Sequence, residues 1–161
     1  MEQRLQEAIR LREAGDHQKA NEQFMELIRD FPEDAVVNYQ CAWSFDVLGE
    51  EAKAVPFYER AIELGLSSED LQGAYLGLGS TYRTLGDYEK SKKTFERAME
   101  VFPANQVLPI FYAMTLYNLQ EHSKAMELLL KCVAETSADP DIVSYKGAIE
   151  FYSTQLDKVW N

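Results

Sequence analysis

Apolar residues recur at intervals of three and four along most of this chain, which places them on one face of a helix. Short breaks interrupt the periodic stretches, and most of them hold a glycine followed by an acidic residue, as in "LGEE" and "LGDY". Glycine suits the left-handed conformation that ends many helices, and an acidic side chain is favourable at the start of the next helix. The pattern therefore predicts amphipathic helices joined in pairs by tight turns.

The turn residues are evenly spaced. Gly15, Gly49, Gly86 and Gln120 stand at equivalent places, at intervals of 34, 37 and 34 residues. A fixed period of this size indicates stacked helix-turn-helix units, each too small to bury its apolar face alone. The longer interval contains "LGLSSEDLQ", which predicts a helix extended by about a turn. We expect four units in one domain, approximately residues 1–34, 35–71, 72–105 and 106–139.

Side chains at fixed distances from each turn residue agree between the units. Seven residues before it and five after it stand small side chains, which allow two helices to approach closely. Four before it and nine after it stand large side chains, which fill the space between helices. The small set is Ala8, Ala42, Gly79, Ala113, Ala20, Ala54, Ser91 and Ala125, and the large set is Leu11, Phe45, Tyr82, Leu116, Phe24, Tyr58, Phe95 and Leu129.

This pattern resembles the tetratricopeptide repeat (TPR), in particular small stand-alone bacterial members of that family. The third unit, "YLGLGSTYRTLGDYEKSKKTFERAMEVFP", fits best, through Tyr75, Leu78, Gly79, Tyr82, Phe95, Ala98 and Pro103. The first helix of the first unit fits least, since Arg4 and Glu7 stand at usually apolar places, as expected for an end unit. The resemblance implies an all-α, right-handed superhelix of four helix pairs plus a C-terminal capping helix.

The last segment predicts one further helix over 140–160. Asp139 and Pro140 suit its first positions, and apolar residues then continue at helical spacing as Ile142, Tyr145, Ile149, Tyr152, Leu156 and Val159. A helix that covers the last unit is the first interpretation. Phe151 and Trp160 lie off this apolar seam, so a homodimer contact or a fold-back toward the groove is the alternative. The candidate dimer or capping surface is Phe151, Tyr152, Leu156 and Trp160.

The resemblance also implies a concave groove lined by the first helix of each unit, with peptides as frequent ligands. The groove positions lie ten, six and three residues before each turn residue and are mostly apolar or aromatic. The candidate binding residues are Arg12, Tyr39, Trp43, Asp46, Leu76, Arg83, Ile110, Met114 and Tyr117. For Leu76, a place in the core between units is an equal alternative.

Some members of the family grip a C-terminal carboxylate with Lys and Asn along these helices. The corresponding places here are Leu5, Ile9, Gln40, Gly73 and Gly77, so that clamp is absent. An apolar groove suits an amphipathic helix or an extended apolar segment, and Arg12 and Arg83 suit acidic groups on it.

Charge, single residues and motifs of the sequence argue against several classes of partner and activity. The 161 residues carry a formal net charge of −11, which argues against nucleic acid or an anionic membrane as partner. Cys41 and Cys132 are expected as buried free thiols, and His17 and His122 as exposed turn residues too far apart to share a metal. No catalytic motif, phosphate-binding loop or apolar signal segment is recognised, so we expect no enzyme, no cofactor, no metal and a cytoplasmic location.

The sequence therefore predicts a non-catalytic protein–protein interaction module that binds a peptide or helix. The first alternative is a TPR-type chaperone that shields apolar segments of a secreted or assembling protein. A regulator or enzyme with a small ligand is the second alternative.

Overall fold

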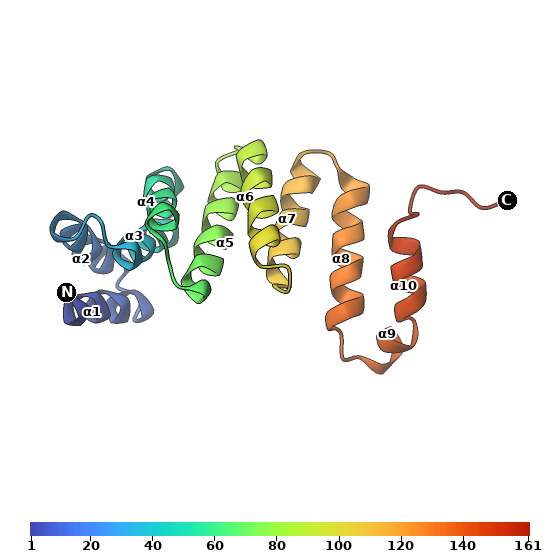
Figure 1. Ribbon diagram of the computed structural model, residues 1–161, viewed down its shortest axis with the longest axis horizontal. Helices are drawn as coiled ribbons and strands as arrows, with labels where there is room; N and C mark the ends of the chain where they lie inside the picture. Colours follow the sequence, from blue (N-terminus) through green and yellow to red (C-terminus); the bar gives the residue numbers. More distant parts are fainter. The chain divides into compact units, whose positions relative to one another are not determined.

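The computed structural model describes residues 1–161 and contains ten helices and no strand (Figure 1). The expected all-α class is confirmed. The helices fall into two compact units, Met1–Asp87 with α1 to α5 and Tyr88–Asn161 with α6 to α10. Their bounds are α1 Glu2–Glu13, α2 His17–Asp30, α3 Ala35–Val47, α4 Glu51–Leu64, α5 Ser68–Thr84, α6 Tyr88–Val101, α7 Val107–Asn118, α8 His122–Thr136, α9 Pro140–Ser144 and α10 Lys146–Ser153.

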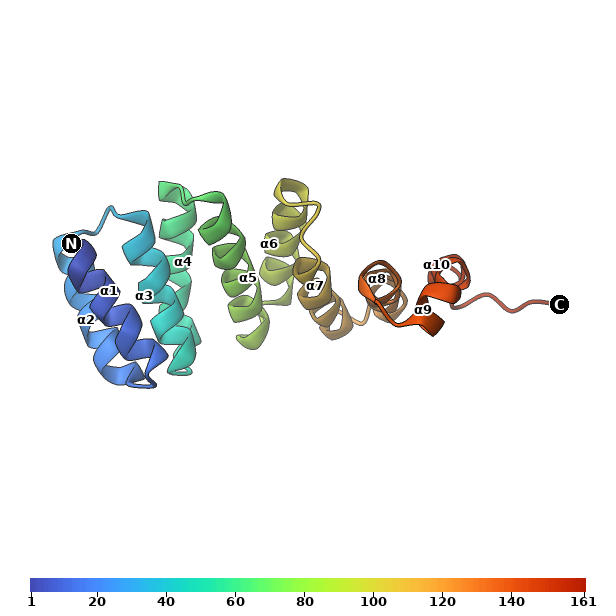
Figure 2. The same ribbon diagram turned by 90° about the horizontal axis from the view of Figure 1, so that it is seen from below.

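In the first unit, each helix packs on the next one along the chain, and α1, α3 and α5 also contact one another in turn. Figure 2 shows α1 beside α2 and α3 beside α4. Small side chains stand where the helices meet, since Ala8, Ala20, Ala42 and Ala54 are fully buried as predicted. Large side chains such as Phe24 fill the spaces between them.

Four first helices end in the same way. Gly15, Gly49 and Gly86 have positive φ angles of 88°, 71° and 81°, and Gln120 adopts the same conformation with φ 63°. The residue after each donates its backbone N–H to the carbonyl five residues earlier, which is the bond that closes a Schellman turn. These pairs are Asp16 to Leu11, Glu50 to Phe45, Asp87 to Tyr82 and Glu121 to Leu116. The predicted turns are confirmed, including the strained one at Gln120.

Three of the acidic residues after these turns stand at the start of a helix without a side-chain cap, where a negative charge is still favourable. Asp16, Glu50 and Glu121 precede α2, α4 and α8, and none of them accepts a side-chain cap hydrogen bond. Ser67 does cap a helix, since its hydroxyl accepts from the Asp70 backbone N–H at 3.2 Å. That cap begins α5, which has 17 residues, so the predicted extension of this helix is confirmed.

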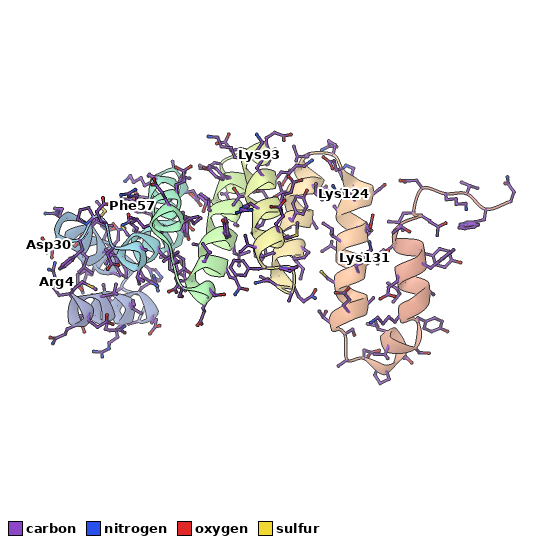
Figure 3. The ribbon with its side chains drawn as sticks, viewed as in Figure 1. Arg4, Asp30, Phe57, Lys93, Lys124 and Lys131 are labelled. Carbon is purple, nitrogen blue, oxygen red and sulfur yellow. The ribbon has the colours of Figure 1, made fainter.

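The polar first turn of α1 belongs to the outer side of the first unit. Arg4 is half exposed and forms an ion pair of 2.6 Å with Asp30 at the end of α2, as seen in Figure 3. Polar side chains at these usually apolar places are therefore compatible with an end repeat that meets water.

In the second unit, α6 packs on α7, α7 on α8 and α8 on α10. Phe95, Leu108 and Leu116 are fully buried, and the hydroxyls of Ser91 and Thr115 lie 2.8 Å apart in the same interior. Ser91 stands at the place that Ala20 and Ala54 hold in the first unit, and Thr115 at the place that Ser44 and Thr81 hold there.

The C-terminal segment differs from the single helix expected over 140–160. Asp139 caps α9 as predicted, but the helix breaks at Tyr145, and no helix continues after Ser153. Apart from the short α9, α8 is the helix that packs on α10, and Ile149 and Ser153 are the partly or fully buried residues of α10. Tyr145 and Val159 of the predicted seam are exposed instead. Helical turns without tertiary packing are marginal in water, which explains the early end of the helix.

No helix is long and apolar enough to cross a membrane. Cys41 and Cys132 are free and buried, as the sequence predicts.

Candidate functional site

The centre of the candidate site is a cation resting on an aromatic ring. Arg12 lies in the last turn of α1, and its guanidinium carbon is 3.9 Å from the centroid of the Trp43 ring on α3. The Phe24 ring lies 5.6 Å away from the same carbon. Arg12 is only 7% exposed, makes no ion pair, and its Nη1 has no hydrogen-bond partner. Burial lowers the pKa of Arg12, although a guanidinium remains charged at any physiological pH.

Trp43 is 42% exposed in a helix whose other side is buried, so it is the open part of this cluster. Tyr39 stands one helical turn earlier and stacks on it, with ring centroids 6.2 Å apart and planes at 28°. Residues four apart share a helix face, which is why α3 presents the two rings together. We call Arg12, Tyr39 and Trp43 the Trp43 surface.

Two glycines of α5 make room for tyrosines from neighbouring helices. A Cβ atom added to Gly73 would lie 2.2 Å from the Tyr39 hydroxyl oxygen. A Cβ atom added to Gly77 would lie 2.5 Å from the ring of Tyr58. These are two of the places that differ from the carboxylate clamp of the family. The structure gives the reason: the space that a side chain would need there is filled by Tyr39 and Tyr58.

Asp46 is engaged inside the first unit and is not an open groove residue. Its Oδ2 accepts from the Tyr58 hydroxyl at 2.6 Å, and its Oδ1 lies 3.0 Å from the Thr81 hydroxyl. The Thr81 hydroxyl also lies 2.8 Å from the Gly77 carbonyl, and one proton serves only one of these two acceptors at a time. Burial raises the pKa of Asp46, while hydrogen bonds from Tyr58 and Thr81 act in the opposite direction.

The other predicted groove residues are spread over two helices. Leu76 and Arg83 are half-buried on α5 in the first unit. Ile110, Met114 and Tyr117 lie on α7 in the second unit, where Met114 and Tyr117 are exposed. Of the predicted groove residues, the structure thus brings Arg12, Tyr39 and Trp43 together.

The structure adds contacts that the repeat pattern did not indicate. Tyr58 and Thr81 hold Asp46, and Phe24 lies beneath Arg12. Tyr58 and Phe24 were expected only as interior residues, and nothing in the sequence distinguishes their second role.

Gln40 is 8% exposed, and its Oε1 has no hydrogen-bond partner.

The candidate C-terminal surface is exposed and aromatic. Phe151 contacts Tyr152 edge-on, with centroids 5.2 Å apart, and Trp160 lies 6.0 Å from Phe151. Leu156 is 45% exposed. The side chain of Asp157 accepts from the Ser123 hydroxyl at 2.5 Å, which ties this segment to the start of α8.

Histidine and acidic side chains form no metal-binding group. His122 is exposed and packs edge-on against Tyr117, while His17 belongs to the first unit. No three His, Cys, Asp or Glu side chains lie close enough together to hold an ion.

Comparison with known proteins shows the family. A family model described as "Tetratrico peptide repeat" matches residues 35–156. The chain therefore belongs to the TPR family. This family and its fold are those of protein-binding scaffolds, which in general are not enzymes.

Individual relatives are distant. Superkiller protein 3 of Saccharomyces cerevisiae is 25% identical over 104 residues, which are 60% of this chain and 7% of that protein. The structure of MamA from residue 41 to its end, from Desulfovibrio magneticus RS-1, has a TM-score of 0.74 and 15% identity. The match covers 96% of this chain and 87% of that one. YrrB, described as a TPR protein with an unusual peptide-binding site, has a TM-score of 0.50 and 22% identity, over 83% of this chain and 80% of that one. These structural likenesses show the fold alone.

Proposed function

We propose that this chain is a non-catalytic scaffold that binds a peptide or an amphipathic helix at the Trp43 surface. The observation that carries the proposal is Trp43 itself, a large aromatic side chain left 42% exposed beside the buried Arg12 and Tyr39. Aromatic and arginine side chains are enriched among the residues that dominate the binding energy of protein interfaces. Aromatic rings bury a large area and have few rotatable bonds.

The helices that carry this surface are suited to hold it rigid. Tyr39 is 8% exposed and packs against Gly73, and its ring lies 6.2 Å from that of Tyr58. A binding surface supported by packed side chains loses little conformational entropy when a ligand arrives.

The apolar character of the surface indicates the ligand class. A segment with one or two apolar anchors would cover the exposed part of Trp43, in the manner of a helix laid in a groove. The net charge of −11 favours a ligand that is not itself strongly acidic.

The test is a pair of tryptophan substitutions. We expect Trp43→Ala to weaken binding of a peptide ligand by about 2 kcal/mol or more, which is the loss typical of an interface hot spot. Trp160→Ala is the matched control, since Trp160 is similarly exposed but lies near the C-terminus. Titration calorimetry measures both, and circular dichroism checks that helix content is unchanged. Equal affinities of Trp43→Ala and the unsubstituted chain would contradict the proposal.

The chaperone alternative has its own supporting observation in the second unit. Met126, Leu129 and Val133 follow one another on α8 at spacings of three and four, and all are exposed. Flexible apolar side chains, methionine above all, suit surfaces that accept several partners. Suppression of the aggregation of an unfolded apolar protein, lost on Met126→Ser with Leu129→Ser, would favour this alternative over a dedicated scaffold.

A further inference from the structure

We propose that Arg12 is a subsite for a carboxylate, supplied by an acidic residue of the peptide that covers Trp43. The inference rests on the proposed function and specifies its ligand: an apolar segment that carries one Asp or Glu beside its anchor. It starts from a guanidinium that is buried and unpaired in the free chain.

The buried guanidinium of Arg12 has aromatic contacts but no carboxylate partner within the chain. Its side chain is 7% exposed, and Nη1 has no hydrogen-bond partner. Desolvating a charge is costly unless it is paired, so buried arginines normally have a carboxylate beside them. The chain has 27 acidic and 16 basic residues, so carboxylates are abundant, yet none lies within ion-pair distance of Arg12. Other arginines of the same unit are more exposed than Arg12 and do form ion pairs, namely Arg4, Arg10 and Arg60.

The contacts that Arg12 makes do not satisfy the donors of its Nη1, which is buried in the free chain. The Trp43 ring lies 3.9 Å from the guanidinium carbon and Phe24 lies 5.6 Å from it, and aromatic rings accept no strong hydrogen bond. Rings of this kind fix the orientation of the guanidinium without satisfying its donors. A carboxylate can accept two of them in parallel, which is the strongest pairing that arginine makes.

A second unpaired group lies on α3, the helix that carries Trp43. Gln40 is 8% exposed, and its Oε1 has no partner. It stands three residues before Trp43, and residues three apart are neighbours on a helix surface. An amide oxygen accepts a hydrogen bond, so Gln40 suits a backbone N–H of the bound segment. A ligand thus finds an unused donor and an unused acceptor near one aromatic anchor.

Long-range charge limits how acidic the ligand can be. The net charge of −11 repels a polyacidic segment, although screening confines this repulsion to about 8 Å at physiological salt. One carboxylate placed against Arg12 gains a close, partly desolvated pairing that outweighs this diffuse repulsion. Further carboxylates add repulsion without a second arginine to pair with at this subsite. We therefore expect a single acidic residue within a segment that is otherwise apolar, polar or basic.

The experiment uses the full chain with Trp160→Phe, which leaves Trp43 as the one tryptophan. Random peptides displayed on phage are selected against this protein, and binders that change the Trp43 fluorescence are kept. We expect one position of these binders to be enriched in Asp or Glu. Replacing this acidic residue of the peptide by Asn or Gln should weaken its binding to the Trp160→Phe protein about tenfold or more.

Arginine variants complete a double-mutant cycle. Arg12→Gln should bind the acidic and amide peptides with affinities within about threefold of each other, because the pairing is gone. Arg10→Gln is the matched control, since Arg10 is an exposed arginine on the same helix, and it should keep the tenfold difference. Arg12→Lys should fall between the two, because lysine keeps the charge and loses the planar fork.

The outcomes separate the two proposals. In one outcome, the binders change Trp43 fluorescence and keep their affinity when their acidic residue is replaced. That result would overturn the Arg12 subsite but not the Trp43 surface. A tenfold loss that persists in Arg12→Gln would also overturn the subsite, because another group would then hold the carboxylate. A selection that yields no Trp43-dependent binder would overturn both.

Discussion

The ring of Tyr58 occupies the space where Gly77 would carry a side chain: a Cβ atom there would lie 2.5 Å from its Cζ and 2.8 Å from its Cε1. Tyr58 cannot easily move away, because it is 2% exposed and its hydroxyl donates to Asp46 at 2.6 Å. Glycine within α5 is thus a packing requirement set by α4. A methyl group at position 77 would collide with the Tyr58 ring, and this ring has little room to move.

We therefore expect Gly77→Ala to destabilise the chain by about 1–2 kcal/mol. Overpacking a filled interior costs about 1–3 kcal/mol, and the better helix propensity of alanine returns at most about 1 kcal/mol. Urea unfolding measures the difference. Gly147→Ala is the matched control, because Gly147 is helical in α10 with nothing within 4 Å of a new Cβ, and it should stabilise by about 0.5 kcal/mol. Equal changes in the free energy of unfolding for the two substitutions would show that the Tyr58 ring moves to make room for the added methyl group.

The burial of Asp46 predicts a pH dependence of stability. Burial raises the folded-state pKa of Asp46 above its ordinary value of 3.8. The folded chain then binds this proton more tightly than the unfolded chain. The stability that Asp46 contributes is therefore greatest below pH 3.8 and is lost as the pH rises through the folded-state pKa.

Asp46→Asn removes that loss while keeping an oxygen that accepts from Tyr58. We expect its free energy of unfolding to gain on that of the unsubstituted chain as the pH rises above 3.8, and then to level off. Asp46→Ala serves as the control: it also lacks the titrating carboxyl but leaves the Tyr58 hydroxyl without its acceptor, so it should be less stable than Asp46→Asn by about 1–3 kcal/mol at every pH. A difference between Asp46→Asn and the unsubstituted chain that is constant with pH would refute the raised pKa.

The repeat architecture could be predicted from sequence because its determinants are local. The glycine turns, the small crossing residues and the Ser67 cap each depend on spacing within one or two helices, and the structure confirms them. The burial of Arg12 could not be predicted, since it depends on how α1 meets α3. Both an open and a buried arginine satisfy the same position in the pattern.

The C-terminal segment shows the same limit. Spacing at three and four predicts that Tyr145, Tyr152 and Val159 share a face, but it does not say whether another helix covers that face. Besides the short α9, one helix, α8, packs on α10; Ile149 and Ser153 are partly or fully buried, and the tyrosines stay exposed. Helical periodicity therefore predicts a helix more reliably where the neighbouring helix is also recognised.

The turn at Gln120 predicts a simple stabilisation. Its φ of 63° is a left-handed conformation that costs a residue with a side chain about 1–2 kcal/mol. We expect Gln120→Gly to stabilise the chain by about 1 kcal/mol in thermal or urea unfolding. The reciprocal control is Gly86→Ala, at an equivalent turn with φ 81°, which should destabilise by a similar amount. Loss of stability in Gln120→Gly would mean that the contact of its Oε1 with His122 Nε2, at 3.1 Å, outweighs the backbone strain.

The exposed C-terminal aromatic side chains predict self-association. Phe151, Tyr152, Leu156 and Trp160 are each 45% to 53% exposed and near one another in sequence, so a second copy is a candidate to cover them. Analytical ultracentrifugation at high micromolar concentration should then show a dimer, and Phe151→Ser with Trp160→Ser should sediment as a monomer. A chain that is monomeric without these substitutions would remove the homodimer from consideration.

Four backbone amides, those of Asp16, Glu50, Asp87 and Glu121, close the same turn in four successive repeats. Stacked repeats open locally, each with its own free energy, because each contacts only its neighbours. These amides are therefore a built-in set of equivalent probes for deuterium exchange, one for each repeat. Their relative exchange rates would rank the repeats by how often each opens, with Glu121, beside the only turn that lacks glycine, expected to exchange first.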